Sequence, residues 1–172
     1  MGGFTPATGQ LWKLTFDEQH VRHLPIHVLE AVGSVTALAL AARTLRGQTV
    51  VVYCDNNAWV ESVRGGSPKD PRLRELLAVQ NQICKEYELT VIIKYVHTDT
   101  NIVADAASRH RMDLAVAELV DKGWARGDIN LLDLNTQPES APPDLTLLLD
   151  RMVQITVART LYRNHITEHT WA

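Results

Sequence analysis

The hydrophobic pattern at the start of the chain changes from alternating to helical. Residues 11–16 alternate between two sides, which predicts a half-exposed antiparallel strand. Residues 2–5, across a turn that contains proline and glycine, are its expected partner. From residue 25 to residue 45 the apolar positions follow a helical spacing, with Pro25 suited to the first turn and Gly47 just past the end.

The middle of the chain reads as strands separated by helices. Two apolar runs rich in β-branched residues, 49–54 and 90–96, are typical of strands buried on both faces. Residues 56–63 and 71–86 between them are helical in pattern, and another helix is expected through residues 104–107. Parallel strands need crossover connections of this kind. The pattern predicts an α/β fold with a mixed sheet, in which an antiparallel N-terminal hairpin joins parallel strands, and with flanking helices.

The composition changes in the last third of the chain. Gly, Asn, Pro, Ser and Asp residues gather over residues 123–143, which indicates a linker. Residues 145–165 are again helical in pattern, but no strand pattern lies beside them. We therefore expect a domain over residues 1–127, a linker over 128–143 and a helical extension over 144–172.

Composition and charge exclude several classes of protein. The chain of 172 residues is 45% hydrophobic and 22% charged, which predicts a folded domain. No run is long and apolar enough for a membrane span, and the N-terminus lacks a signal-peptide pattern. Cys54 and Cys84 lie in apolar stretches without metal-ligand spacing, which fits an intracellular protein of the cytoplasm or nucleus. The net charge of -3 argues against binding nucleic acid through bulk charge, so we expect it to be held locally or through metal ions.

Three carboxylates are candidates for chemistry. Glu30 is the only charged residue over positions 28–42, so it either faces a cleft where cations bind or makes a favourable helix N-terminal contact. Asp55 ends an apolar strand, where ligands bind in parallel sheets, and the alternative is an N-cap for the next helix. Asp105 lies among alanines that allow a close approach to the sheet, and its alternative is a solvated surface aspartate.

A small basic cluster lies between the two central helices and at the start of the second. Its members are Arg64, Lys69, Arg72 and Arg74. These side chains either contact a nucleic-acid backbone or form the solvated start of a helix.

Four segments together resemble a known family. They are residues 27–31 (HVLEA), 52–58 (VYCDNNA), 95–97 (YVH) and 101–109 (NIVADAASR). Their succession resembles the ribonuclease H domain that follows reverse transcriptase in retroelements. The resemblance is closest to the DIRS-like group, whose elements integrate by a tyrosine recombinase. It extends over residues 2–109 and is most specific in its last segment.

The resemblance implies an RNase H-like fold and metal-dependent hydrolysis of the RNA strand of RNA–DNA hybrids. Glu30, Asp55 and Asp105 match three of the family's four metal-binding positions, which in a complete site hold two Mg²⁺ or Mn²⁺ ions. Further residues are expected to contact nucleic acid or to support the site. The nucleic-acid contacts expected are Asn56, Asn57, Arg64, Lys69, Arg72 and Asn101, and the supporting residues are His97, Ser108 and Arg109.

The chain departs from the family pattern at its start. In the family a first aspartate bridges both metals from a central strand, which precedes a segment like residues 2–4 of this chain. We therefore expect impaired cleavage, and an open position in the sheet that another segment, a second copy or a swapped strand fills. Residues 148–151 and 156–165 resemble, faintly, the opening helix of a tyrosine recombinase core-binding domain, so the rest of such a polyprotein is an expected partner. The alternative is a non-catalytic remnant of the fold that binds nucleic acid or protein.

Overall fold

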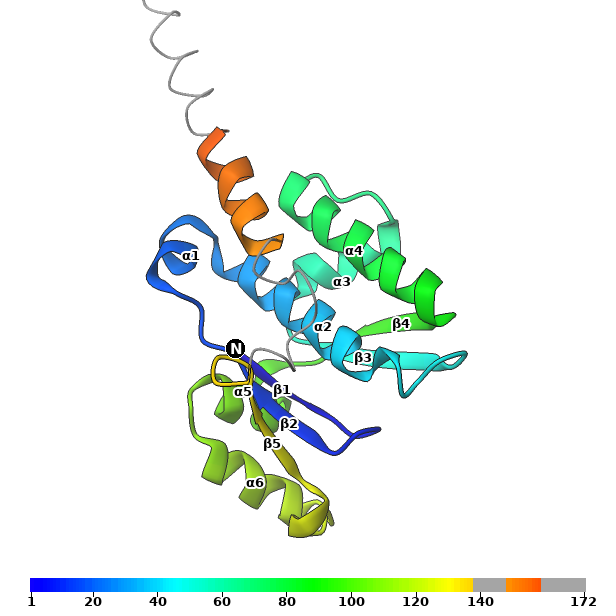
Figure 1. Ribbon diagram of the computed structural model, residues 1–172, viewed down its shortest axis with the longest axis vertical. Helices are drawn as coiled ribbons and strands as arrows, with labels where there is room; N and C mark the ends of the chain where they lie inside the picture. The colour runs from blue at the N-terminus through cyan, green and yellow to red at the C-terminus, as the bar shows by residue number, and fades with distance from the viewer. Residues whose placement is uncertain (138–147, 159–172) are drawn as a thin grey trace, which may run out of the picture.

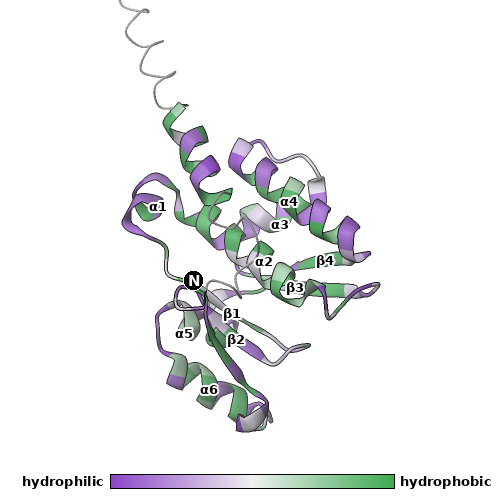
Figure 2. Cartoon of the chain, in the orientation of Figure 1, coloured by the Kyte–Doolittle hydropathy of each residue, from purple (hydrophilic) through white to green (hydrophobic). Residues whose placement is uncertain are grey.

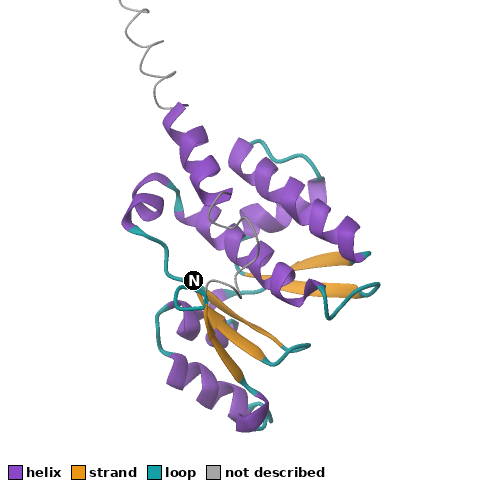
Figure 3. Ribbon diagram, viewed as in Figure 1, coloured by secondary structure: helices purple, strands orange, loops and turns teal. Residues whose placement is uncertain are grey.

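A computed structural model describes residues 1–137 and 148–158 of the chain. It confirms an α/β fold with antiparallel and parallel strand pairs and flanking helices (Figure 1). Over these residues the strands form two short sheets, which Figure 3 shows as separate groups. In the same part of the chain no helix is long and apolar enough to cross a membrane.

The first sheet contains the predicted N-terminal hairpin. Strands β1 (Gly2–Thr5) and β2 (Gln10–Lys13) are antiparallel, and Gly9 closes the turn between them with a φ of +64° that favours glycine. A third strand, β5 (Asn130–Asp133), pairs with β2 in parallel. The structure therefore differs from the expected linker over 128–143, because four of its residues belong to the sheet.

The second sheet contains the two strands that the apolar runs predict, but the prediction that they are buried on both faces is wrong. Helices cover only part of this two-stranded sheet, and side chains of both strands are exposed: Val51, Tyr53, Ile92 and Tyr95. Strand β3 (Thr49–Cys54) pairs in parallel with β4 (Thr90–Tyr95), as the apolar runs predict. The crossover between them consists of α3 (Asn57–Gly65) and α4 (Pro71–Tyr87). Asp70 caps α4 and Pro71 occupies its first turn, a start signal that is readable in the sequence.

The two sheets share no hydrogen-bonded strand pair within residues 1–137. Strand β1 forms one edge of its sheet, and both strands of the second sheet are edges. A strand edge carries backbone N–H and C=O groups that have no hydrogen-bond partner on a neighbouring strand. Whether a further strand fills a position between β1 and β3 stays a prediction.

Helices cover the strands and connect the two sheets. Helix α2 (Ile26–Ala42) contacts β1, β3, α3 and α4, so it bridges both halves of the molecule. It ends three residues before the predicted end, and a turn then leads to β3. The other helices are α1 (Glu18–His23), α5 (Ile102–Ser108) and α6 (Met112–Asp121), with short 3-10 turns η1 (Thr98–Thr100) and η2 (Arg126–Asp128).

Helix α5 lies unusually close to β1. A Cβ atom at Gly2 would lie 2.6 Å from the Cβ of Ala107, which is closer than two such carbons can approach. Ala106 and Ala107 are both buried at this contact. The alanines around Asp105 therefore allow the close approach to a strand that the sequence predicts. Gly2 of β1 contributes to it from the other side, because it has no Cβ atom to block Ala107.

The largest core cluster includes a helix from the end of the chain. Residues 148–158 are helical and appear in orange in Figure 1. Their apolar side chains pack with those of α2, α3 and α4: Leu148, Leu149, Met152 and Val153. Figure 2 shows green apolar and purple polar residues alternating along the helices, as expected when one face packs on a core.

The expected extension over 144–172 is therefore, where the structure describes it, part of the domain's core. Polar contacts add to this packing. Nε2 of the buried His20 lies 3.2 Å from a carboxylate oxygen of Asp150, and the other ring nitrogen lies 2.8 Å from Asp17. Residues 138–147 and 159–172, which include residues 159–165 of the recombinase-like segments, lie outside the described part.

Candidate metal and nucleic-acid site

The structure decides between the alternatives for Glu30. Helix α2 begins at Ile26 after the N-cap residue Pro25, so Glu30 lies beyond the first turn and does not cap the helix. Burial raises the pKa of the Glu30 carboxyl, and the nearby Asp55 carboxylate raises it further, whereas His27 lowers it. Glu30 therefore shares an electrostatic environment with a second carboxylate.

Asp55 lies at the carboxyl end of β3, where the chain turns into α3. The N-cap of α3 is Asn56, whose Oδ1 accepts a hydrogen bond of 3.0 Å from the Trp59 N–H, so Asp55 is not the cap. Neither Asp55 nor Glu30 is thus explained by helix capping. The two carboxylates come from different elements and act on each other electrostatically, so a bound cation would relieve their repulsion.

Asp105 has a different environment. It lies in the first turn of α5, and both of its carboxylate oxygens accept hydrogen bonds from Nε of Arg109, at 2.8 and 2.9 Å. Ser108 donates to the Asp105 backbone carbonyl at 2.8 Å, and the Asn101 carbonyl accepts from the Asp105 N–H. Arg109 and Ser108 therefore support the turn that carries Asp105, while the Asn101 side chain makes no capping hydrogen bond.

The three carboxylates do not yet form a complete metal site. Mg²⁺ and Mn²⁺ prefer several oxygen ligands, of which carboxylates are the commonest charged kind. Across residues 1–137 and 148–158, no three His, Cys, Asp or Glu side chains lie close enough together to hold an ion. These residues alone do not fit the two-ion site that the resemblance implies, and that site stays a prediction.

The position of each carboxylate explains why the set is divided. Asp55 ends β3 in the second sheet, whereas Asp105 lies on α5, which packs on β1 of the first sheet. Glu30 lies on α2, the helix that contacts both β1 and β3. The distance from Asp105 to Glu30 and Asp55 therefore depends on the position of the first sheet relative to the second.

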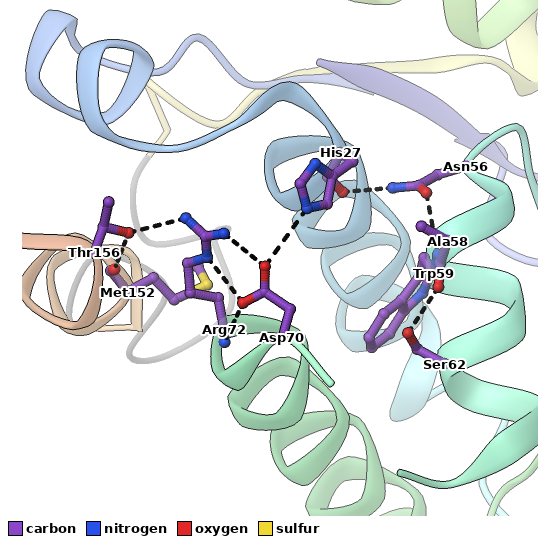
Figure 4. Close-up of polar contacts among 9 residues, drawn as sticks. All are labelled: His27, Asn56, Ala58, Trp59, Ser62, Asp70, Arg72, Met152 and Thr156. Carbon is purple, nitrogen blue, oxygen red and sulfur yellow. Dashed lines mark hydrogen bonds and ion pairs between the residues drawn. The ribbon is translucent and has the colours of Figure 1, made fainter. Parts of the chain in front are cut away.

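Asn56 has an internal role instead of an exposed one. Its side chain is 4% exposed, and its Nδ2 donates to the backbone carbonyl of His27 in the first turn of α2 (Figure 4). The nucleic-acid contact expected at Asn56 has no exposed side chain to make it. Asn57, the next residue, is exposed at the start of α3, and a nucleic-acid contact there stays a prediction.

The basic cluster divides into buried and exposed members. Arg72 is only 11% exposed on its side chain, because it forms two hydrogen bonds with Asp70, of 3.0 and 2.6 Å, and one of 3.1 Å with Thr156. This arginine connects α4 to the C-terminal helix and is not available to phosphate. Arg64 and Lys69 are exposed, with Arg64 3.5 Å from Glu61.

His97 lies at the end of β4, away from any buried environment. Its side chain is exposed, and Nδ1 lies 3.2 Å from Asp99 in η1. A supporting role for His97 stays a prediction.

The sequence did not reveal the polar network that holds the helices together. Asp70 accepts from Arg72 and also lies 3.7 Å from Nε2 of His27, so it connects α4 with α2 (Figure 4). Asp70 before Pro71 is a recognisable capping signal, but its partners on other helices are fixed only by the packing.

The chain matches no protein-family model, no curated protein and no solved structure. The likeness to ribonuclease H domains therefore rests on the quoted residues. The structure adds an α/β fold, a carboxylate at the end of a parallel strand, Asp55, and a second carboxylate on α2, Glu30, on which Asp55 acts electrostatically.

Proposed function

We propose that this chain is the RNase H-like part of a retroelement reverse transcriptase polyprotein. Its activity is hydrolysis of the RNA strand of RNA–DNA hybrids with Mg²⁺ or Mn²⁺, inside the cell. The observation that carries this proposal is that Asp55, at the end of β3, acts electrostatically on Glu30 of α2, and that the hydrogen bond from Asn56 to His27 joins these two elements. Neither carboxylate is used as a helix cap.

Glu30 and Asp55 contribute two oxygen donors to the ligand set, and their proximity favours binding of a divalent cation. Because Asp105 lies on α5, which packs on the first sheet, and pairs with Arg109, these residues alone support hybrid binding better than cleavage. Arg64, Lys69 and Asn57 are the exposed residues that contact the nucleic-acid backbone in this proposal. Such contacts weaken as salt is added.

Completion of the sheet is part of the same proposal. A strand between the open edges of β1 and β3 holds the two sheets in one register and provides the position for a further carboxylate. The strand comes from the remainder of the polyprotein, or from a second copy of this chain by strand exchange.

The test compares cleavage of a labelled RNA–DNA hybrid by this chain and by a version extended upstream. We expect little or no cleavage by the chain alone and Mg²⁺-dependent cleavage by the extended version. Glu30→Gln and Asp55→Asn should each abolish that cleavage.

Divalent cations should also raise the unfolding midpoint of the chain, because a ligand that binds only the folded state stabilises it. An extended version that is folded and inactive, together with no cation effect on the unfolding midpoint of either the chain or the extended version, would contradict the proposal.

A second candidate function is a non-catalytic module that binds nucleic acid or protein. The observation that favours it is the ion pair of Asp105 with Arg109, which leaves only two carboxylates grouped in the described residues. Hybrid binding that is the same with Mg²⁺ and with a chelator, in both the chain and its extended version, would support this module.

A further inference from the structure

Asn56 connects the two elements that carry the paired carboxylates. Its Oδ1 caps α3 by accepting from Trp59, and its Nδ2 donates to the carbonyl of His27 on α2 (Figure 4). The side chain is buried, so both hydrogen bonds lie away from water, where the loss of a partner is costly.

The position of these hydrogen bonds relates directly to the carboxylates. Asp55 immediately precedes Asn56, and Glu30 lies three residues after His27 on the same side of α2. The buried side-chain amide of Asn56 therefore connects the backbone next to Asp55 with the turn of α2 that leads to Glu30.

The first turn of α2 is also held from its other side. The His27 ring lies 3.7 Å from Asp70, which is itself bound by Arg72 on α4. The His27 turn is thus fixed between α3 and α4, so a change at Asn56 moves α3 and Asp55 relative to it.

This attachment opposes a force that separates the pair. Like charges repel, and the hydrogen bond from Asn56 to His27 holds together the two elements that carry Glu30 and Asp55.

We propose that Asn56 is a positioning residue that sets the spacing between Glu30 and Asp55. Its importance for chemistry rests on the proposed function, but the spacing itself can be measured without any activity. Asn56→Ser keeps an oxygen that can cap α3 and removes the amide that reaches His27. Asn57→Ser is the matched control, since Asn57 is the exposed neighbour of the same residue type.

The experiment is a double-mutant cycle on unfolding free energy at neutral pH and low salt. Glu30→Gln and Asp55→Asn, alone and together, measure the repulsion between the two carboxylates. We expect a repulsive coupling in the parent chain, the same coupling with Asn57→Ser, and a coupling reduced at least about twofold with Asn56→Ser. A coupling that is unchanged by Asn56→Ser, or that is zero in the parent chain, overturns the inference.

Asn56→Asp serves as a second variant and as a test of charge. It also keeps a capping oxygen and removes the donor, but it adds a negative charge beside the pair. Mn²⁺ binding, followed by electron paramagnetic resonance, should weaken in both variants if spacing decides affinity. Stronger Mn²⁺ binding by Asn56→Asp with an unchanged coupling in Asn56→Ser would show that charge alone matters and refute the positioning role.

The parent chain separates this inference from the proposed function. If it shows the coupling between Glu30 and Asp55 but binds no Mn²⁺, the positioning role of Asn56 stands and the proposed metal function is wrong.

Discussion

Met152 provides a direct test of whether the C-terminal helix belongs to the domain. Its side chain is 0% exposed and lies in the largest core cluster, in contact with the side chains of α2, α3 and α4. Met152→Ala removes three heavy atoms, which at about 0.8 kcal/mol for each buried methylene-sized group costs about 2.5 kcal/mol of transfer free energy. The cavity that remains adds to this cost, so the expected destabilisation is roughly 2–5 kcal/mol.

The assay is urea unfolding of the full chain, supported by the thermal midpoint. For a protein of this size, a loss of about 3 kcal/mol lowers the midpoint by roughly 6–12 °C. Val157→Ala is the matched control, because Val157 lies on the same helix but is 39% exposed. It should change stability by less than about 0.5 kcal/mol.

A Met152→Ala chain that unfolds with the same free energy as the Val157→Ala chain would refute the reasoning. The helix over 148–158 would then be an independent extension, as its sequence pattern suggests. Destabilisation in the expected range would instead make this helix part of the cooperative unit that carries the carboxylates.

Further predictions concern the close helix–strand contact and two titrating carboxylates. Gly2→Ala should destabilise by about 1–3 kcal/mol in thermal unfolding, since its Cβ would meet α5 at 2.6 Å, whereas Gly65→Ala, with no atom within 4 Å, should be neutral or stabilising. Glu30→Gln should stabilise the fold at pH 7, because the raised pKa of Glu30 means that its ionised form is disfavoured in the folded state, and the gain should shrink as pH falls to about 4. Asp133→Asn should destabilise by at most about 1 kcal/mol at pH 7, because the hydrogen bond from Lys13 lowers the pKa of Asp133, and this effect should vanish as pH falls through that lowered pKa. Urea unfolding at pH 7 and at about pH 4 checks Glu30, and a series continued to about pH 2 checks Asp133, whose lowered pKa lies below the ordinary aspartate value. A pH trend of the opposite sign would contradict either prediction.

Local patterns in the sequence predicted the long elements well. The runs at 49–54 and 90–96 form β3 and β4, and the helix predicted over 71–86 matches α4 within one residue. These elements have strong apolar periodicity and clear start or stop residues, such as Gly66, whose φ of +66° ends α3. Such signals depend only on neighbouring residues.

The short elements could not be predicted in this way, because distant contacts stabilise them. Helix α1 has six residues, too few to be stable alone, and its buried His20 lies between Asp17 and Asp150, the latter 130 positions away. Strand β5 has four residues and depends on pairing with β2. Both elements reflect the tertiary fold more than their own sequence.

Only the part of the candidate site that depends on local sequence signals could be predicted. Glu30 and Asp55 lie at positions where a carboxylate is unusual in its local pattern, and Asp55 contributes to the raised pKa of Glu30. The pairing of Asp105 with Arg109 follows from the i, i+4 spacing on a helix and could have been read from the sequence. The buried role of Asn56 could not, because His27 is 29 positions away.

The division of the carboxylates between two sheets connects the open strand position to the chemistry. Asp105 and Arg109 form a pair that is largely exposed, and such pairs contribute less than about 1 kcal/mol. The position of α5 relative to α2 and β3 has the larger effect, because α5 is fixed on β1 by the contact between Gly2 and Ala107. A strand that pairs with both β1 and β3 would therefore act on the site twice, by fixing the position of Asp105 and by adding its own side chains beside Glu30 and Asp55.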